Sequence, residues 1–150
     1  MSEFGITASQ TVGPFLKIGL AQGDQEYVVA ENAKGALRID GHVYDGQGQP
    51  VPDAMIEIWQ CDTQGRLPTD HHATNTNFTG FARAGTDENG RYVFETVKPG
   101  RISTSDNILQ APHIDVLVFA RGLLSHLYTR IYFSDESSKK LGTILNSLSI

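Results

Sequence analysis

The chain has 150 residues and a formal net charge of −5 at pH 7. Its length favours a single globular domain, and its charge argues against nucleic acid or an anionic membrane surface as a partner. Cys61 is its only cysteine, so a disulfide framework is excluded. No run of about 18 apolar residues occurs, and no basic segment followed by an apolar run stands at the start, so we expect a cytoplasmic protein without a membrane span.

The first 35 residues show no sustained hydrophobic periodicity. Gly13 and Pro14 both oppose helix formation, and the stretch from Ala21 to Gly35 is polar. Long segments of this kind in compact proteins are disordered or pack onto a partner. We therefore expect residues 1–35 to form an extended arm with little structure of its own.

From residue 36 the pattern changes to the period-two alternation of half-buried strands. Turn sequences rich in Gly, Asp and Asn separate the apolar runs, for example at Asp45–Gly48 and Asp87–Gly90. Several short strands at regular spacing predict an all-β fold, an antiparallel β-sandwich over residues 36–134. The predicted strands are Leu37–Tyr44, Met55–Gln60, Phe78–Ala84, Arg91–Val97, Gln110–Gly122 and Leu127–Phe133. We expect the last two to pair antiparallel, and residues 101–109 to form a loop.

After Ser134 the period changes to that of a helix. Four apolar residues follow the spacing i, i+3, i+4 and i+7; they are Leu141, Ile144, Leu145 and Leu148. This spacing predicts a short C-terminal helix within residues 135–150. Together with the arm and the sandwich, this tail completes a single domain that spans residues 1–150.

His113 and Asp115 stand at the head of the apolar run Val116–Phe119. On a strand their spacing turns both side chains to one face, where they form either half of a metal site or a buried hydrogen-bonded pair. A metal site needs further ligands, and the adjacent His71 and His72 of a polar loop point in opposite directions. We favour the hydrogen-bonded pair, or a histidine that is capped by the backbone, and keep a self-contained metal site of His113, Asp115 and a loop histidine as an alternative.

Arg121 ends the same predicted strand with a fixed positive charge. It can bind a carboxylate through two hydrogen bonds, although an ion pair is the commoner fate of an arginine at a strand end. The segment Thr11–Phe15 can line the rim of a pocket or simply bend the chain. These residues alone indicate a β-sandwich without a complete active site.

Five separate stretches of the chain resemble one protein family. Gly41–Gly65 and Gly90–Gly100 resemble the sandwich core of the intradiol ring-cleavage dioxygenases. Ser9–Phe15, Ala111–Gly122 and Thr129–Phe133 are similar to the α-type chains within that family. The resemblance covers nearly the whole chain and implies the β-sandwich fold and the ring-cleaving activity of this family.

The resemblance implies a site in which two tyrosinates and two histidines hold ferric iron, a hard ion that favours anionic oxygen donors. The positions that match these ligands are Leu67, Ile102, His113 and Asp115. Only His113 keeps the ligand type, so we expect a degenerate site and no metal on this chain. The resemblance places Fe(III) instead on a β-type subunit, paired with this α-type chain in a hetero-oligomer.

The resemblance also implies that an α-type chain supplies no catalytic residue but helps to form a substrate pocket at the subunit interface. The matching substrate-binding residues are Thr11, Gly13, Pro14, Phe15 and Arg121. Phe15 stands where the family has a tyrosine, so the hydrogen bond of a phenol is lost. The implied substrates are protocatechuate and O2, and the implied product is 3-carboxy-cis,cis-muconate, in aromatic catabolism through the β-ketoadipate pathway.

Two expectations complete the sequence analysis. The α-type chains of the family continue with closing strands where this chain ends at Ile150, so we expect a shortened tail and an exposed sheet edge. The alternative function is that of a non-catalytic β-sandwich module that binds carbohydrate or serves adhesion. The arm motif Thr11–Phe15 argues against this alternative.

Overall fold

The computed structural model describes residues 5–13, 15–21, 23, 25–30, 33–68, 78–103 and 108–136. The elements within these residues are α1 (Phe15–Leu20), β1 (Leu37–His42), β2 (Met55–Trp59), β3 (Phe81–Gly85), β4 (Arg91–Thr96), β5 (Ile102–Ser103), β6 (Leu109–Gln110), β7 (His113–Phe119) and β8 (Leu127–Tyr132). In this described part of the chain, the helix α1 has six residues and is far too short to span a bilayer. The predicted tail helix lies outside the described residues, as do Pro14, His71 and His72.

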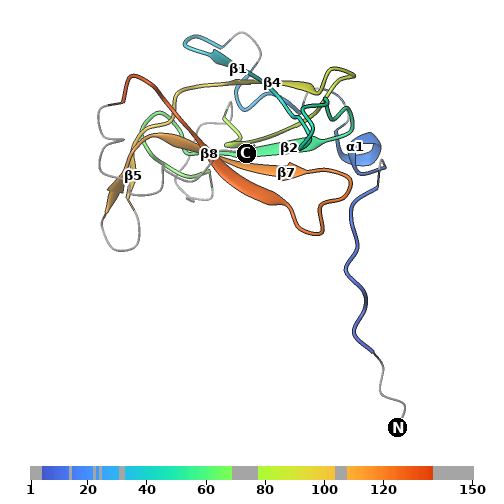
Figure 1. Ribbon diagram of the computed structural model, residues 1–150. Helices are drawn as coiled ribbons and strands as arrows, with labels where there is room; N and C mark the ends of the chain where they lie inside the picture. The colour runs from blue at the N-terminus through green and yellow to red at the C-terminus, as the bar shows by residue number, and fades with distance from the viewer. Residues whose placement is uncertain are drawn as a thin grey trace.

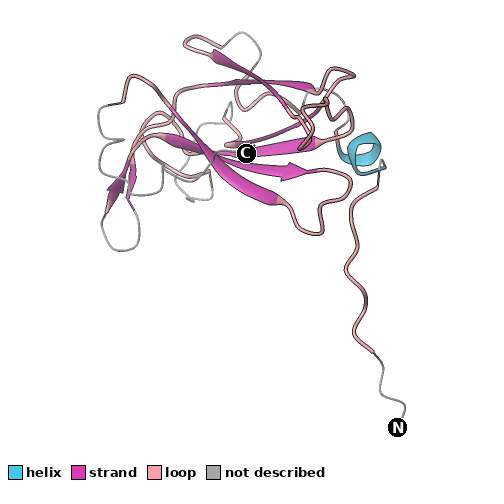
Figure 2. Ribbon diagram, in the orientation of Figure 1, coloured by secondary structure: helices cyan, strands magenta, loops and turns pink. Residues whose placement is uncertain are grey.

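The strands form a two-layered antiparallel sandwich (Figures 1 and 2). One layer is a four-stranded sheet in the order β3-β2-β7-β8, and the other is the two-stranded sheet β1-β4. Every pair of named strands is antiparallel, so the predicted all-β antiparallel sandwich is confirmed. β7 and β8 pair as the sequence predicts, from His113 opposite Tyr132 to Val118 opposite Leu127.

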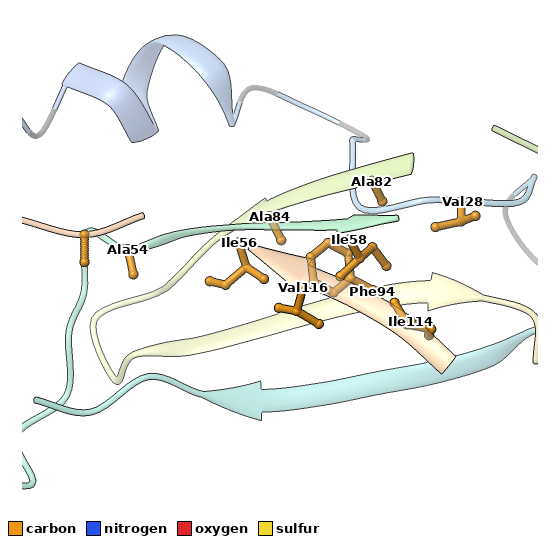
Figure 3. Packing of buried hydrophobic residues seen from close by; sticks show 10 residues of the cluster. Val28, Ala54, Ile56, Ile58, Ala82, Ala84, Phe94, Ile114 and Val116 are labelled. Carbon is orange, nitrogen blue, oxygen red and sulfur yellow. The ribbon is translucent and has the colours of Figure 1, made fainter. Parts of the chain in front are cut away.

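The hydrophobic core lies between the two layers and contains the fully buried Phe94 of β4. Figure 3 shows the ring of Phe94 among Ile56, Ile58 and Val116, which come from the four-stranded sheet. Because side chains alternate along a strand, Ile56 and Ile58 point into the core while Glu57 lies on the opposite face of β2. The four-stranded sheet therefore has an outer face that does not contribute to the core.

The N-terminal region differs from the predicted arm, because residues 25–30 form part of the sandwich. The amide of Val28 donates a hydrogen bond to the carbonyl of Glu95 (2.9 Å), and the carbonyl of Val28 accepts one from the amide of Thr79 (2.9 Å). The side chain of Val28 is fully buried. Two adjacent valines in a polar stretch give no periodicity, so this segment is missed in the sequence. Residues 5–13 do extend away from the body of the molecule (Figure 1).

The predicted loop 101–109 also contains structure, since the short strands β5 and β6 pair antiparallel within this region. Ile102 lies opposite Gln110, and Ser103 lies opposite Leu109. Strands of two residues are too short to produce a period-two pattern. Their pairing holds Ile102 close to the start of β7, where the candidate site lies.

Candidate functional site

The outer face of the four-stranded sheet carries the two polar residues that the strand pattern singled out. His113 and Asp115 lie on the same face of β7, and the intervening Ile114 is fully buried in the core on the other face. His113 is buried, and Asp115 is half-buried. The structure therefore confirms that the spacing of these two residues brings their side chains to one face.

A pocket of about 240 Å³ lies at the head of β7 on this outer face. Its lining includes His113 and Asp115 from β7, Ile102 from β5, Leu67 from the loop after β2, and the indole of Trp59 at the end of β2. The structure thus brings together all four positions that match the iron ligands of the family. We call this cavity the β7-head pocket.

The loop that carries Leu67 is fixed by a turn built on Asp62. Its Oδ1 atom accepts hydrogen bonds from the backbone amides of Gln64 (2.8 Å) and Arg66 (3.0 Å). Burial acts to raise the pKa of Asp62, but hydrogen bonds from the backbone and side chain of Arg66 and from Gln64 outweigh it, and the pKa is lowered. Gly65 has φ of +80°, and a Cβ atom there would lie 2.0 Å from the carbonyl oxygen of Arg101. Only glycine allows this close approach, which places Leu67 beside the loop of Ile102.

The imidazole of His113 is fixed by the backbone. Its Nδ1 atom lies 2.8 Å from the carbonyl oxygen of Ala111. Because a carbonyl only accepts hydrogen bonds, Nδ1 carries a proton and donates it. Nε2 lies 3.8 Å from Oδ1 of Asp115, which is too long for a hydrogen bond. The structure therefore shows a histidine that is capped by the backbone with a carboxylate nearby, and no direct hydrogen bond between His113 and Asp115.

The carboxylate of Asp115 is already engaged by two donors from β8. Its Oδ1 atom accepts hydrogen bonds from the hydroxyl of Tyr128 and from Nε of Arg130, the latter at 2.7 Å. The register of the sheet explains the second contact, since Asp115 lies directly opposite Arg130. Burial, followed by the hydrogen bond to Asp115, raises the pKa of the Tyr128 phenol. The negative charge of Asp115 is therefore balanced within the chain by a guanidinium.

These residues do not fit a ferric ion. Leu67 and Ile102 have no donor atoms, and the carboxylate of Asp115 is held by Arg130, whose positive charge opposes a metal cation. Among the residues that the structure describes, no group of three or more His, Cys, Asp or Glu side chains could hold a metal. The pocket keeps the shape of a ligand site but only one ligand of the expected type.

A second cluster lies at the other end of β7, where the N-terminal arm meets the loop between β7 and β8. The hydroxyl of Thr11 accepts a hydrogen bond of 2.8 Å from the amide of Gly122. The neighbouring Arg121 forms an ion pair through Nε with Oδ2 of Asp53, and its side chain is 63% exposed. The structure thus joins two of the predicted substrate-binding residues, Thr11 and Arg121, which we call the arm cluster together with Asp53 and Gly122.

The other predicted substrate-binding residues lie near this cluster in sequence but are less constrained. Gly13 is exposed and its carbonyl accepts a hydrogen bond of 3.1 Å from the amide of Leu16. Phe15 begins α1, and its ring is 79% exposed. Gly13 has no side chain and the phenyl ring of Phe15 forms no hydrogen bonds, so their predicted contact with a substrate stays a prediction.

The β7-head pocket and the arm cluster are separate sites. A strand rises by about 3.3 Å per residue, so Asp115 and Phe119, the last residue of β7, lie roughly 13 Å apart along the strand, and Arg121 follows two residues later. The seven-residue strand β7 connects them, with His113 at its first position. Arg121 therefore does not serve the pocket that contains His113.

Two contributors to these sites are not identifiable in the sequence. Arg130 was not expected to be the partner of Asp115, because pairing two strands does not define their register. Asp53 was not expected to be the partner of Arg121, because the two residues are distant in sequence and meet only in the folded chain. The alternation of Tyr128, Arg130 and Tyr132 on one face of β8 was the one available signal for the first contact.

Comparison with known proteins defines the class of this fold and site. A family model described as dioxygenase matches residues 14–147. The dioxygenase domain from Streptomyces sp. SirexAA-E has the same fold, with a TM-score of 0.65 and 23% sequence identity over 81% of this chain and 72% of that one. The sandwich is therefore that of a dioxygenase domain.

Sequence comparison places the chain within this class. It is 43% identical to the α chain of protocatechuate 3,4-dioxygenase from Burkholderia cepacia, over 92% of this chain and 75% of that one. The β chain from the same organism is 36% identical, over 65% of this chain and 44% of that one. The chain belongs to the intradiol ring-cleavage dioxygenase family, a family of iron enzymes, and the predicted resemblance is confirmed.

Proposed function

We propose that this chain is the α-type subunit of a protocatechuate 3,4-dioxygenase and works in a cytoplasmic hetero-oligomer. A β-type subunit holds the ferric iron. The complex uses O2 to open the ring of protocatechuate between its two hydroxyl-bearing carbons, which gives 3-carboxy-cis,cis-muconate in the catabolism of aromatic compounds. This chain contributes to the substrate pocket and is inactive by itself.

The observation that carries the proposal is the separation of the two sites along β7. The β7-head pocket is lined by all four positions that the resemblance matches to iron ligands, but two of these positions are Leu67 and Ile102, which have no donor atoms. The exposed cation of Arg121 lies at the opposite end of the strand. An aromatic acid bound by Arg121 therefore needs an iron centre from another chain, which is the arrangement of an α-type subunit.

The guanidinium of Arg121 is suited to bind the carboxylate of protocatechuate. Its Nε atom is engaged by Asp53, and its two terminal nitrogens have no partner among the residues that the structure describes. A planar guanidinium binds a carboxylate through two parallel hydrogen bonds. We assign to Arg121 the recognition of the substrate carboxylate, which orients the ring for cleavage.

The arm residues complete the proposed pocket. Thr11 holds the loop of Arg121 through its hydrogen bond with Gly122. We assign the rim of the pocket to Gly13 and Pro14 and the contact with the substrate ring to the exposed Phe15. A phenylalanine ring supplies apolar contact area without a hydrogen bond.

Co-expression with a β-type chain, such as that of Burkholderia cepacia, tests the proposal. We expect the two chains to purify together as a complex that contains iron, absorbs visible light and cleaves protocatechuate. The matched control is the β-type chain expressed alone, which we expect to lose most of its activity. A β-type chain that is fully active alone and never co-purifies with this chain would falsify the proposal.

A further inference from the structure

The arm cluster contains a carboxylate, Asp53, that no sequence motif singled out. Asp53 lies in the turn before β2 and pairs through Oδ2 with Nε of Arg121. The two side chains differ in exposure, because that of Asp53 is 17% exposed and that of Arg121 is 63% exposed. The carboxylate is thus the fixed member of the pair, and the guanidinium reaches from it towards the surface.

The second oxygen of Asp53 shows that local stability does not explain this residue. Oδ1 is buried and has no hydrogen-bond partner among the described residues. A buried carboxylate oxygen without a donor destabilises the folded state. A buried polar group of this kind calls for a reason beyond the turn itself, and its contact with Arg121 supplies one.

The turn that carries Asp53 is held rigidly from two sides. The hydroxyl of Thr86 accepts a hydrogen bond from the amide of Ala54 (3.0 Å) and donates one to the carbonyl of Val51 (2.6 Å). Thr86 is almost completely buried. These two bonds fix the backbone on each side of Asp53, so the carboxylate has a defined position.

Lys17 of α1 supports the same turn from the N-terminal arm. Its ammonium donates hydrogen bonds to the carbonyl of Pro52 (2.9 Å) and to the carbonyl of Thr86. Its aliphatic stem passes over Gly85, where a Cβ atom would lie 2.7 Å from Cε of Lys17. The lysine therefore links α1 to the backbone next to Asp53. Its stem fills the space that a Cβ atom at Gly85 would occupy.

We propose that Asp53, supported by Lys17, is a positioning residue that orients Arg121 for carboxylated substrates. The inference rests on the proposed function, because it requires that Arg121 binds the substrate. An arginine side chain has many rotamers, and a free one loses more conformational entropy when it binds. Asp53 selects one orientation through Nε and leaves the edge with the two terminal nitrogens available for the substrate carboxylate.

The test compares variants of this chain in the iron-loaded complex with a β-type chain. We expect Asp53→Ala to raise KM for protocatechuate about tenfold, since small misplacements of a binding group strongly weaken productive binding. KM for catechol, which has no carboxylate, and kcat for both substrates change by less than about twofold. Asp53→Asn keeps an oxygen atom beside Nε of Arg121 and removes only the charge, so we expect it to recover most of the affinity.

Two further variants test whether the effect on KM is specific to the turn of Asp53. Gly85→Ala displaces the stem of Lys17 and leaves Asp53 itself unchanged, so we expect a smaller rise in KM for protocatechuate alone. Asp40→Ala is the matched control, since Asp40 pairs with Arg91 on the other sheet. We expect this control to leave both KM values unchanged.

A direct readout of orientation is the NMR signal of the Nε–Hε group of Arg121 in this chain. In the original chain and in Asp53→Asn, we expect a dispersed Nε–Hε signal that is protected from exchange with water. In Asp53→Ala, we expect a signal that is averaged over several orientations of the side chain. Equal KM changes for protocatechuate and catechol in the Asp53 variants would mean a merely structural role and overturn the proposal.

The Arg121→Ala variant separates the two proposals. If it raises KM for protocatechuate while Asp53→Ala does not, the positioning role is wrong and the proposed function stands. If Arg121→Ala itself has no effect that depends on the carboxylate, the assignment of Arg121 fails and the positioning role of Asp53 fails with it.

Discussion

Each end of β7 has an aspartate paired with an arginine, but the two pairs differ in how exposed their side chains are. At the head, the carboxylate of Asp115 receives hydrogen bonds from Tyr128 and Arg130 of the same chain. At the tail, Arg121 is exposed and is held by Asp53 through Nε alone. An arginine neutralises an aspartate at both ends, but the guanidinium at the tail is 63% exposed against 27% at the head, so it is the more accessible to another molecule.

This difference indicates which end has a function in the complex. We propose that the head of β7 is a degenerate metal site in which Arg130 neutralises Asp115. A working binding site keeps hydrogen-bonding groups without internal partners, because a ligand completes them. By this criterion we propose that the arm cluster binds the substrate, whereas the β7-head pocket contributes to the stability of the chain.

The largest expected effect comes from removing the charge at the tail of β7. In the complex with a β-type chain, we expect Arg121→Ala to raise KM for protocatechuate about a hundredfold, because the substrate carboxylate loses its charged partner. KM for catechol changes little. Steady-state kinetics with both substrates measures the ratio of the two effects.

The matched variant at the head of β7 is His113→Asn, which keeps a donor for the carbonyl of Ala111. We expect its KM and kcat in the same complex to remain within about twofold of the original values. A large loss of activity in His113→Asn, with the variant folded, would show that the β7-head pocket takes part in catalysis.

The head of β7 is expected to contribute to stability instead. Asp115→Ala leaves the half-buried guanidinium of Arg130 without its carboxylate, so we expect a loss of about 1–3 kcal/mol in the free energy of unfolding. Urea unfolding of the purified chain measures it. Asp40→Ala is the control, because both side chains of the Arg91–Asp40 pair are about 40% exposed (39% and 42%), so water screens their attraction and the pair contributes little. Equal losses in the two variants would contradict the special role of Asp115.

Much of the fold could be predicted from the sequence, because alternating apolar residues and glycine-rich turns define strands locally. The six long strands were found in this way, with ends that differ by a few residues. Residues 25–30 were missed because their burial depends on hydrogen bonds to distant residues on two sides, Glu95 and Thr79. Their own sequence shows no alternation of apolar and polar residues, because Val28 and Val29 are adjacent and lie between Tyr27 and Ala30.

The next prediction concerns the backbone conformation at the tail of β7. Gly122 has φ of +85°, so Gly122→Ala is strained even though no atom lies within 4 Å of the added Cβ. We expect a loss of about 1–2 kcal/mol in stability and a rise in KM for protocatechuate, since the strain shifts the loop of Arg121.

Gly48 offers a matched control for this substitution. It has φ of +78° and equally open surroundings in a turn of the other sheet layer. We expect Gly48→Ala to lose a similar amount of stability without any change in KM. A rise in KM for both variants would attribute the effect to general destabilisation and not to the arm cluster.

The smallest expected effect is a pH dependence that belongs to the head of β7. The pKa of Asp62 is lowered from 3.8, so its contribution to stability is complete above the ordinary value and is lost as the pH falls through the folded value. We expect Asp62→Asn to lose about 1 kcal/mol at neutral pH and to differ less from the original chain at acidic pH. Urea unfolding at both pH values measures this change.

The control for this variant is Asp45→Asn. Asp45 accepts hydrogen bonds from the amides of Gln47 (2.9 Å) and Gln49 (2.8 Å) in an exposed turn far from the β7-head pocket. We expect a smaller loss at neutral pH, since this variant breaks no contact like that between the buried carboxylate of Asp62 and Arg66. A larger acid-dependent loss in Asp45→Asn than in Asp62→Asn would contradict the assigned role of Asp62.

The candidate site could be predicted only in part. The spacing of His113 and Asp115 was enough to place both side chains on one face, because the strand period is fixed at two. The state of the site depends on Arg130 and Asp53, whose contacts arise from strand register and from tertiary approach. Neither the strand register nor this tertiary contact can be predicted from hydrophobic periodicity and turn residues in one sequence.

The location of iron in the complex tests the central claim most directly. Anomalous diffraction at the iron edge, from crystals of the complex with a β-type chain and protocatechuate, gives that location. We predict iron outside the β7-head pocket, in the partner chain, with the substrate carboxylate directed at the guanidinium of Arg121. Iron bound to Nε2 of His113, between Leu67 and Ile102, would contradict the account.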